Sequence, residues 1–124
     1  MNTVAKTIIN NLCDDLHFDN VDAGWYTDIK TGLPLERNIG EIIALIHSEL
    51  SEALEAYRKG LNDDKLPHRL GIEVELADAV IRIMDLCGYQ KLDLGGAMLE
   101  KIAYNRQRAD HKLQNRLKDG GKKF

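Results

Sequence analysis

Two pairs of acidic residues interrupt an otherwise apolar helical pattern. Glu49 and Glu52 lie in one expected helix, in line with its apolar stripe, and Glu75 and Asp78 lie in a narrow polar seam of the next. Residues three apart on a helix project from one face, so each pair can chelate a cation. Four carboxylates brought together inside a helical bundle would repel one another and lose their hydration, so they require a cationic partner.

The chemistry of these side chains favours a hard divalent metal ion. Carboxylate oxygens without imidazole suit Mg²⁺ or Mn²⁺ and leave open positions for water and phosphate. Di-iron sites in helical bundles use Glu-x-x-His pairs, whereas Glu52 and Asp78 occupy the corresponding positions here. We therefore expect Mg²⁺ as the cofactor, with Mn²⁺ able to substitute for it.

The spacing of apolar residues predicts four helices that would position these carboxylates. Apolar residues recur at helical spacing over residues 3–16, 38–59 and 70–87. Gly60 and Gly88 follow the second and third helices, as C-terminal caps do. A fourth helix is expected to begin near Asp93, which can serve as its N-cap, and to become polar near Arg106.

A long loop is expected between the first two helices. Residues 17–37 lose the helical period and carry Gly24, Gly32 and Pro34. Trp25 lies in this loop, where an indole ring can stack on a nucleobase. Because a tryptophan in such a loop more often anchors the loop to the core, anchoring is the favoured interpretation.

The whole chain is expected to form one all-α domain, a four-helix bundle. It has 124 residues, of which 44% are hydrophobic and 30% charged, and no segment alternates as a strand does. Residues 1–37 form the N-terminal helix and loop, and residues 109–124 form a basic, flexible tail. The helix over residues 70–87 is apolar around too much of its circumference for a lone bundle, so a homodimer or a dimer of dimers is expected.

Charge and hydropathy restrict the partners and the location. Residues 101–124 hold eight Lys or Arg and two Asp, residues 1–100 hold nine against eighteen acids, and the net charge is −3. A net acidic chain argues against binding to a nucleic-acid polymer. No apolar run approaches the ~20 residues that cross a bilayer, and the start lacks a signal peptide. A cytoplasmic protein without a membrane partner is therefore expected.

The acidic motifs resemble those of a known enzyme family. HSELSEALEAYRKG followed by EVELADAVIRIMD is similar to the ExxE…ExxD signature of the MazG-like, all-α nucleoside triphosphate pyrophosphohydrolases, relatives of dimeric dUTPases and dCTP pyrophosphatases. KIAYNRQRADHK and GGKKF resemble the closing Lys…Asn…Arg segment and basic end of that family. The resemblance covers about residues 38–124. It implies a four-helix fold completed by homo-oligomerisation, and hydrolysis of a nucleoside triphosphate between its α and β phosphates.

The resemblance also implies roles for individual residues. The four carboxylates would be the magnesium ligands, and Glu49 or Glu52 would orient or deprotonate the attacking water. The chain has no GxxxxGK[ST] loop, so metal and side chains must hold the phosphates. The expected phosphate contacts are Lys101, Asn105 and Arg108, with Lys112, Lys122 and Lys123 as further ones.

The identity of the nucleotide and two non-catalytic functions stay open. Trp25 and Asn11 are candidate nucleobase contacts, and the aromatic loop favours a purine deoxynucleotide. Asp85 continues the polar seam of its helix, where it could bind an extra ion or pair with Arg82, and the salt bridge is the favoured interpretation. The chain could instead be a helical dimerisation or regulatory module whose acid pairs bind its own basic helix, or a sensor that binds a nucleotide without cleaving it.

Overall fold

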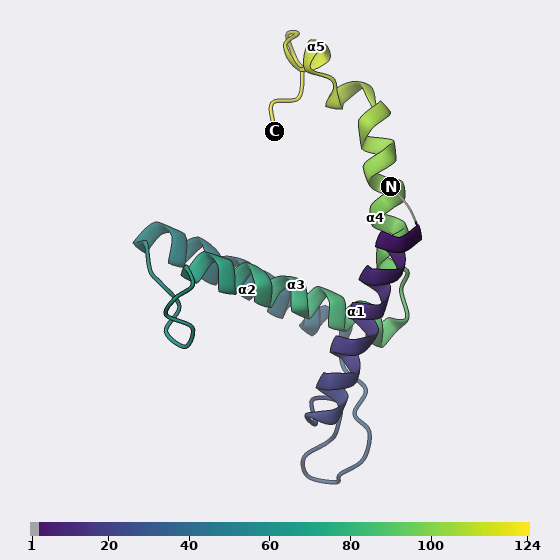
Figure 1. The fold of residues 1–124 in the computed structure, drawn as a ribbon, viewed down its shortest axis with the longest axis vertical. Coiled ribbons are helices and arrows are strands. Elements are labelled where there is room, and N and C mark those ends of the chain that lie inside the picture. The colour runs from purple at the N-terminus through teal and green to yellow at the C-terminus, as the bar shows by residue number, and fades with distance from the viewer. Residues whose placement is uncertain (1–2) are drawn as a thin grey trace. The chain divides into compact units, whose positions relative to one another are not determined.

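The protein is all-helical in a computed structural model that describes residues 3–124 (Figure 1). This confirms the expected all-α class. Residues 3–124 contain two isolated bridges, Thr27 with Pro34 and Asn62 with Leu70, and no longer strand. The elements are α1 (Thr3–Asp22), α2 (Ile39–Lys59), α3 (Gly71–Gln90), α4 (Leu94–Gln107), the 3-10 helix η1 (Ala109–His111) and α5 (Leu113–Arg116).

Local capping explains where three helix ends fall. The side chain of Asn38 accepts a hydrogen bond from the backbone N–H of Glu41 at the start of α2. Gly60 ends that helix with a φ of 61°, a left-handed conformation that glycine adopts without strain. The Asp93 carboxylate accepts from the Gly96 N–H at the start of α4. The expected caps at Gly60 and Asp93 are confirmed.

Two other helix ends differ from the expectation. α1 continues to Asp22 instead of ending at residue 16, because no glycine or proline interrupts the chain before Gly24. α3 passes through Gly88 and ends before Lys91, which has a φ of 53°. Gly88 is buried against α1, so its lack of a side chain serves helix packing and not capping.

The described chain divides into two compact units, and the boundary between them falls within α1. One unit, residues 11–92, contains α2 and α3, which pack side by side along their length (Figure 1). The core of this unit includes Ile42, Ile46 and Ala53 from α2 and Ala79 from α3. This helix pair positions the acidic residues.

The other unit comprises residues up to Asn10 together with Asp93–Phe124. Asn10 joins its segments, because its amide donates to the Asp93 carboxylate and accepts from the Gly95 N–H, both at 2.8 Å. Near the C-terminus the Arg116 guanidinium donates to the carbonyl oxygens of Lys122 and Lys123. The single domain and the flexible tail over residues 109–124 stay predictions. Among residues 3–124, no helix combines the length and the apolarity that crossing a membrane would require.

Candidate metal centre

Three of the four acidic residues converge between α2 and α3. Glu49, Glu52 and Glu75 each offer a carboxylate oxygen, and these oxygens lie within 4.8 Å of one another. Glu49 is buried, Glu75 is half-buried and Glu52 is exposed, so the cluster runs from the helix interface to the surface. The three-residue spacing on α2 brings two of these side chains to the face that meets α3.

The carboxylates of this cluster perturb one another. Burial raises the pKa of Glu75 to about 7, and hydrogen bonds to the carboxylates of Glu52 and Glu49 and their negative charges add to the rise. Near neutral pH the Glu75 carboxyl group therefore keeps its proton in part of the molecules.

Asp78 lies one turn after Glu75 and outside the group of three converging oxygens. Its pKa is raised mainly by burial and then by the negative charge of Glu49, while the Arg82 guanidinium lowers it. The sequence suggested a salt bridge between Arg82 and Asp85, but Arg82 pairs with a different acid. The Arg82 Nε donates to Oε1 of Glu49 at 2.9 Å. Glu49 therefore already has one cationic neighbour.

A cavity of about 500 Å³ adjoins the acidic cluster. Its wall combines two carboxylates of the candidate site with two guanidinium groups, an indole ring and aliphatic side chains, a mixture that suits a ligand with an anionic part and an aromatic part. The lining residues are Asn20, Trp25, Arg37, Leu45, Glu49, Asp78, Ile81, Arg82 and Asp85.

The loop between α1 and α2 reaches this cavity through Trp25. The Trp25 side chain is 66% exposed, so it does not anchor the loop, contrary to the favoured interpretation. The neighbouring Tyr26, 7% exposed, is the anchor. Adjacent residues in an irregular loop point in different directions, and the sequence alone cannot tell which aromatic ring faces inward. Stacking of Trp25 on a nucleobase stays a prediction.

Asn20 and Arg37 are among the cavity-wall residues that the sequence analysis did not predict. Asn20 lines the cavity, whereas Asn11 is exposed on the same helix and is not among the lining residues. Arg37 also lines the cavity. It lies at the end of the loop, where the sequence has no helical period from which the direction of its side chain could be predicted. Only the positive charge of Arg37, shortly before the helix that carries Glu49 and Glu52, could have indicated a role in binding an anion.

The expected phosphate contacts belong to the unit that contains α4. The Lys101 ammonium lies 4.6 Å from the centre of the Tyr104 ring, and the Arg108 guanidinium pairs with Asp110 at 2.9 Å. The buried side-chain oxygen of Asn105 has no hydrogen-bond partner among the described residues. The role of Lys101, Asn105 and Arg108 towards phosphate stays a prediction.

The residues present fit a hard divalent cation. The cluster supplies carboxylate oxygens and no imidazole or thiolate, which is the donor set that Mg²⁺ and Mn²⁺ prefer. The pKa of Glu75, raised first by burial and then by the neighbouring carboxylates, is consistent with this donor set, because a bound cation would stabilise the ionised form of Glu75.

The metal-free protein is expected to lose stability as the pH rises through the range in which Glu75 titrates. An unfolded glutamate ionises near its ordinary value of 4.5, whereas folded Glu75 ionises at about 7. Between these values the native state binds the extra proton, so stability falls as the pH increases. Thermal melts in a chelator should show this slope for the wild type, and Glu75→Gln should flatten it. An identical slope in both proteins would contradict the assignment.

The chain matches no family model, no curated protein and no solved structure. The resemblance to the MazG-like enzymes therefore rests on the quoted motifs alone. What that resemblance implies about activity remains a proposal.

Proposed function

We propose that this protein hydrolyses a nucleoside or deoxynucleoside triphosphate between the α and β phosphates, with Mg²⁺ as cofactor. The observation that carries the proposal is the position of the acidic cluster at a cavity that also contains cationic and aromatic side chains. Glu49 belongs to both features. This combination of an anionic metal cluster and a mixed cationic and apolar wall suits a metal-bound triphosphate.

The converging carboxylates of Glu49, Glu52 and Glu75 would hold the metal, with Asp78, which lies outside that group, as the fourth expected ligand, and Mn²⁺ would substitute for Mg²⁺. When bound, such an ion lowers the pKa of a coordinated water and neutralises charge on the phosphoryl oxygens. Glu49 or Glu52 would orient the attacking water and accept its proton. One oxygen of Glu49 is already held by Arg82, so its carboxylate has a fixed orientation.

The rest of the cavity would bind the nucleotide. Arg37 and Arg82 offer guanidinium groups for the phosphates, which pair strongly with such forked donors. Trp25 offers a ring face on which a nucleobase can stack, and Leu45 and Ile81 provide apolar wall. These residues bind and orient the substrate and take no part in proton transfer.

The activity is tested with a panel of ribo- and deoxynucleoside triphosphates in the presence of Mg²⁺ or Mn²⁺, with chromatographic separation of the products. The proposal predicts a nucleoside monophosphate and intact pyrophosphate as the first products. A nucleoside diphosphate and orthophosphate would contradict the cleavage position. Saturable binding without turnover would instead identify a nucleotide sensor.

Arg108→Ala is expected to weaken the binding of a nucleoside triphosphate more than that of the monophosphate. The predicted contact is to the phosphates that leave, and losing one charge-assisted hydrogen bond costs about 1.5–3 kcal/mol. Arg106→Ala removes the same charge from an exposed position on α4 and serves as the control. Equal losses for both nucleotides, measured by calorimetry, would exclude a role for Arg108 at the leaving group.

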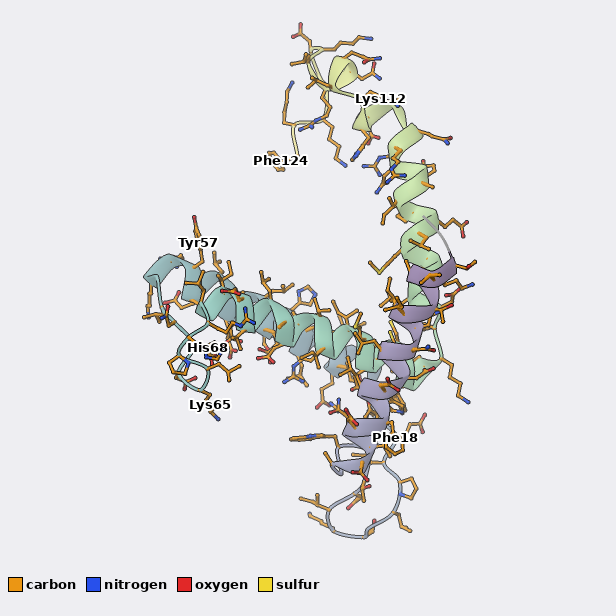
Figure 2. The ribbon with its side chains drawn as sticks, viewed as in Figure 1. Phe18, Tyr57, Lys65, His68, Lys112 and Phe124 are labelled. Carbon is orange, nitrogen blue, oxygen red and sulfur yellow. The ribbon has the colours of Figure 1, made fainter. Side chains whose placement is uncertain are left out.

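A homodimer, or a dimer of dimers, is expected in solution. Large apolar side chains stay exposed on both α2 and α3. On α2 they include Leu54, 60% exposed, and Tyr57, 70% exposed, which projects from its helix (Figure 2). Leu76 and Val80 on α3 are also exposed. Such apolar surface is usually buried against another molecule. Sedimentation should find no folded, active monomer at micromolar concentration, and finding one would contradict this expectation.

A further inference from the structure

Asp85 is a buried acid that the proposed chemistry does not use. It is 6% exposed, and its two oxygens contact different elements. The hydroxyl group of Tyr26 donates to Oδ2 at 2.8 Å, and Nδ1 of His17 lies 3.0 Å from Oδ1. A buried carboxylate is tolerated only when such partners replace its lost hydration. Asp85 on α3 thus joins α1 and the loop that follows it.

Tyr26 is the point where this loop is fixed. Its ring packs edge-on against His17 and lies beside Tyr89, with centroid distances of 4.7 Å to each. Burial and the hydrogen bond to Asp85 raise the pKa of the Tyr26 hydroxyl far above its ordinary value, so it remains a donor.

Both loop residues that line the cavity are connected to Tyr26 or to the neighbouring Tyr89. Trp25 directly precedes Tyr26 in the chain. The Arg37 guanidinium lies 5.5 Å from the centre of the Tyr26 ring, and the Arg37 backbone N–H donates to the Tyr89 hydroxyl at 3.0 Å. A shift of Tyr26 would therefore move the indole and the guanidinium together.

We propose that Tyr26, Asp85 and His17 form a clamp that positions Trp25 and Arg37 at the cavity and thereby sets the affinity for nucleotide. This inference rests on the proposed function. Tyr26 and His17 are positioning residues, because they do not line the cavity and would act through Trp25 and Arg37, whereas Asp85 both anchors Tyr26 and contributes to the cavity wall.

Tyr26→Phe removes the clamp hydroxyl and keeps the ring. Trp25 is the only tryptophan of the chain, so its fluorescence reports the loop directly and without any need for turnover. The probe is a nucleoside triphosphate with a methylene group between the α and β phosphates, titrated with Mg²⁺. We expect a shifted Trp25 emission maximum and a dissociation constant about tenfold higher than in the wild type, the effect of losing a hydrogen bond to a charged group. With hydrolysable substrate, KM should rise by a similar factor while kcat changes less than about twofold.

Tyr57→Phe is the matched control, because Tyr57 is exposed on α2 and does not line the cavity.

Asp85→Asn is a second variant that keeps an acceptor for the Tyr26 hydroxyl, so it should retain more affinity than Tyr26→Phe. Adding Tyr26→Phe to a chain that carries Asp85→Ala should cause no further loss, because both changes remove the same bond.

The outcomes separate the clamp from the proposed function. Unchanged Trp25 emission and unchanged affinity in Tyr26→Phe would overturn the clamp, whether or not the protein is an enzyme. A wild type that binds the probe but releases no pyrophosphate from natural triphosphates would overturn the proposed hydrolysis, while the shifts in Tyr26→Phe would still support the clamp. A wild type that releases pyrophosphate from natural triphosphates, but whose Trp25 fluorescence does not respond to the probe, would support the proposed hydrolysis and overturn the clamp.

Discussion

Glu49→Gln and Glu75→Gln are each expected to lower the rate of triphosphate hydrolysis by about 100-fold or more, because each replaces an anionic metal ligand with a neutral amide of the same shape. Both side chains belong to the converging cluster, so the loss of either oxygen weakens the whole site. The rate is measured as pyrophosphate release at saturating substrate and a fixed Mg²⁺ concentration.

Melting temperatures with and without Mg²⁺ separate loss of metal from loss of fold. Mg²⁺ should stabilise the wild type by mass action and stabilise the variants much less. Glu75→Gln should be at least as stable as the wild type in a chelator at pH 8, because it relieves repulsion within the cluster. Glu73→Gln is the matched control, since Glu73 pairs with Arg69 on the exposed side of α3. Wild-type turnover with intact Mg²⁺ stabilisation in either cluster variant would refute the metal site.

Gly88→Ala is expected to destabilise the protein by about 1–3 kcal/mol through overpacking. A Cβ atom at this position would press on the carbonyl oxygen of Cys13 and lie 2.6 Å from the Cβ of His17. Both of these neighbours are on α1. Because helix backbones are rigid, α1 and α3 would have to move apart to accommodate the added methyl group.

Urea denaturation measures this loss of stability. Gly40→Ala is the control, because Gly40 is exposed near the start of α2 and its added Cβ would lie 3.2 Å from the Asn38 side chain. Alanine favours a helix over glycine by about 1 kcal/mol, so this variant should be neutral or slightly more stable. Equal midpoints for Gly88→Ala and the wild type would show that α1 and α3 do not pack closely at Gly88.

The sequence predicts α2 well, because its apolar residues keep one period from end to end. Ile42 and Ile46 are buried as that period requires, and Gly60 ends the helix. The end of α1 could not be placed in this way. Residues 17–22 lack an apolar stripe, and they are helical because the helix continues until Gly24.

The candidate site is predictable where one helix determines it and unpredictable where several segments meet. The three-residue spacing of Glu49 and Glu52 fixes their common face. Of the four carboxylates expected to come together, Glu75 converges with this pair and Asp78 does not. The partners of Asp85 lie 59 and 68 residues earlier in the chain, at Tyr26 and His17. Periodicity describes the faces of a helix and says nothing about which distant segment packs on each face.

Calorimetric titration of Mg²⁺ into the protein near pH 7, in two buffers of different ionisation enthalpy, tests most directly whether the acidic cluster holds a divalent metal. Because the pKa of Glu75 is about 7, metal binding must release the proton that this carboxyl group retains in part of the molecules. We predict saturable binding whose heat depends on the buffer in the wild type, with this dependence lost in Glu75→Gln. The absence of saturable binding, or the same proton release from Glu75→Gln, would contradict the account.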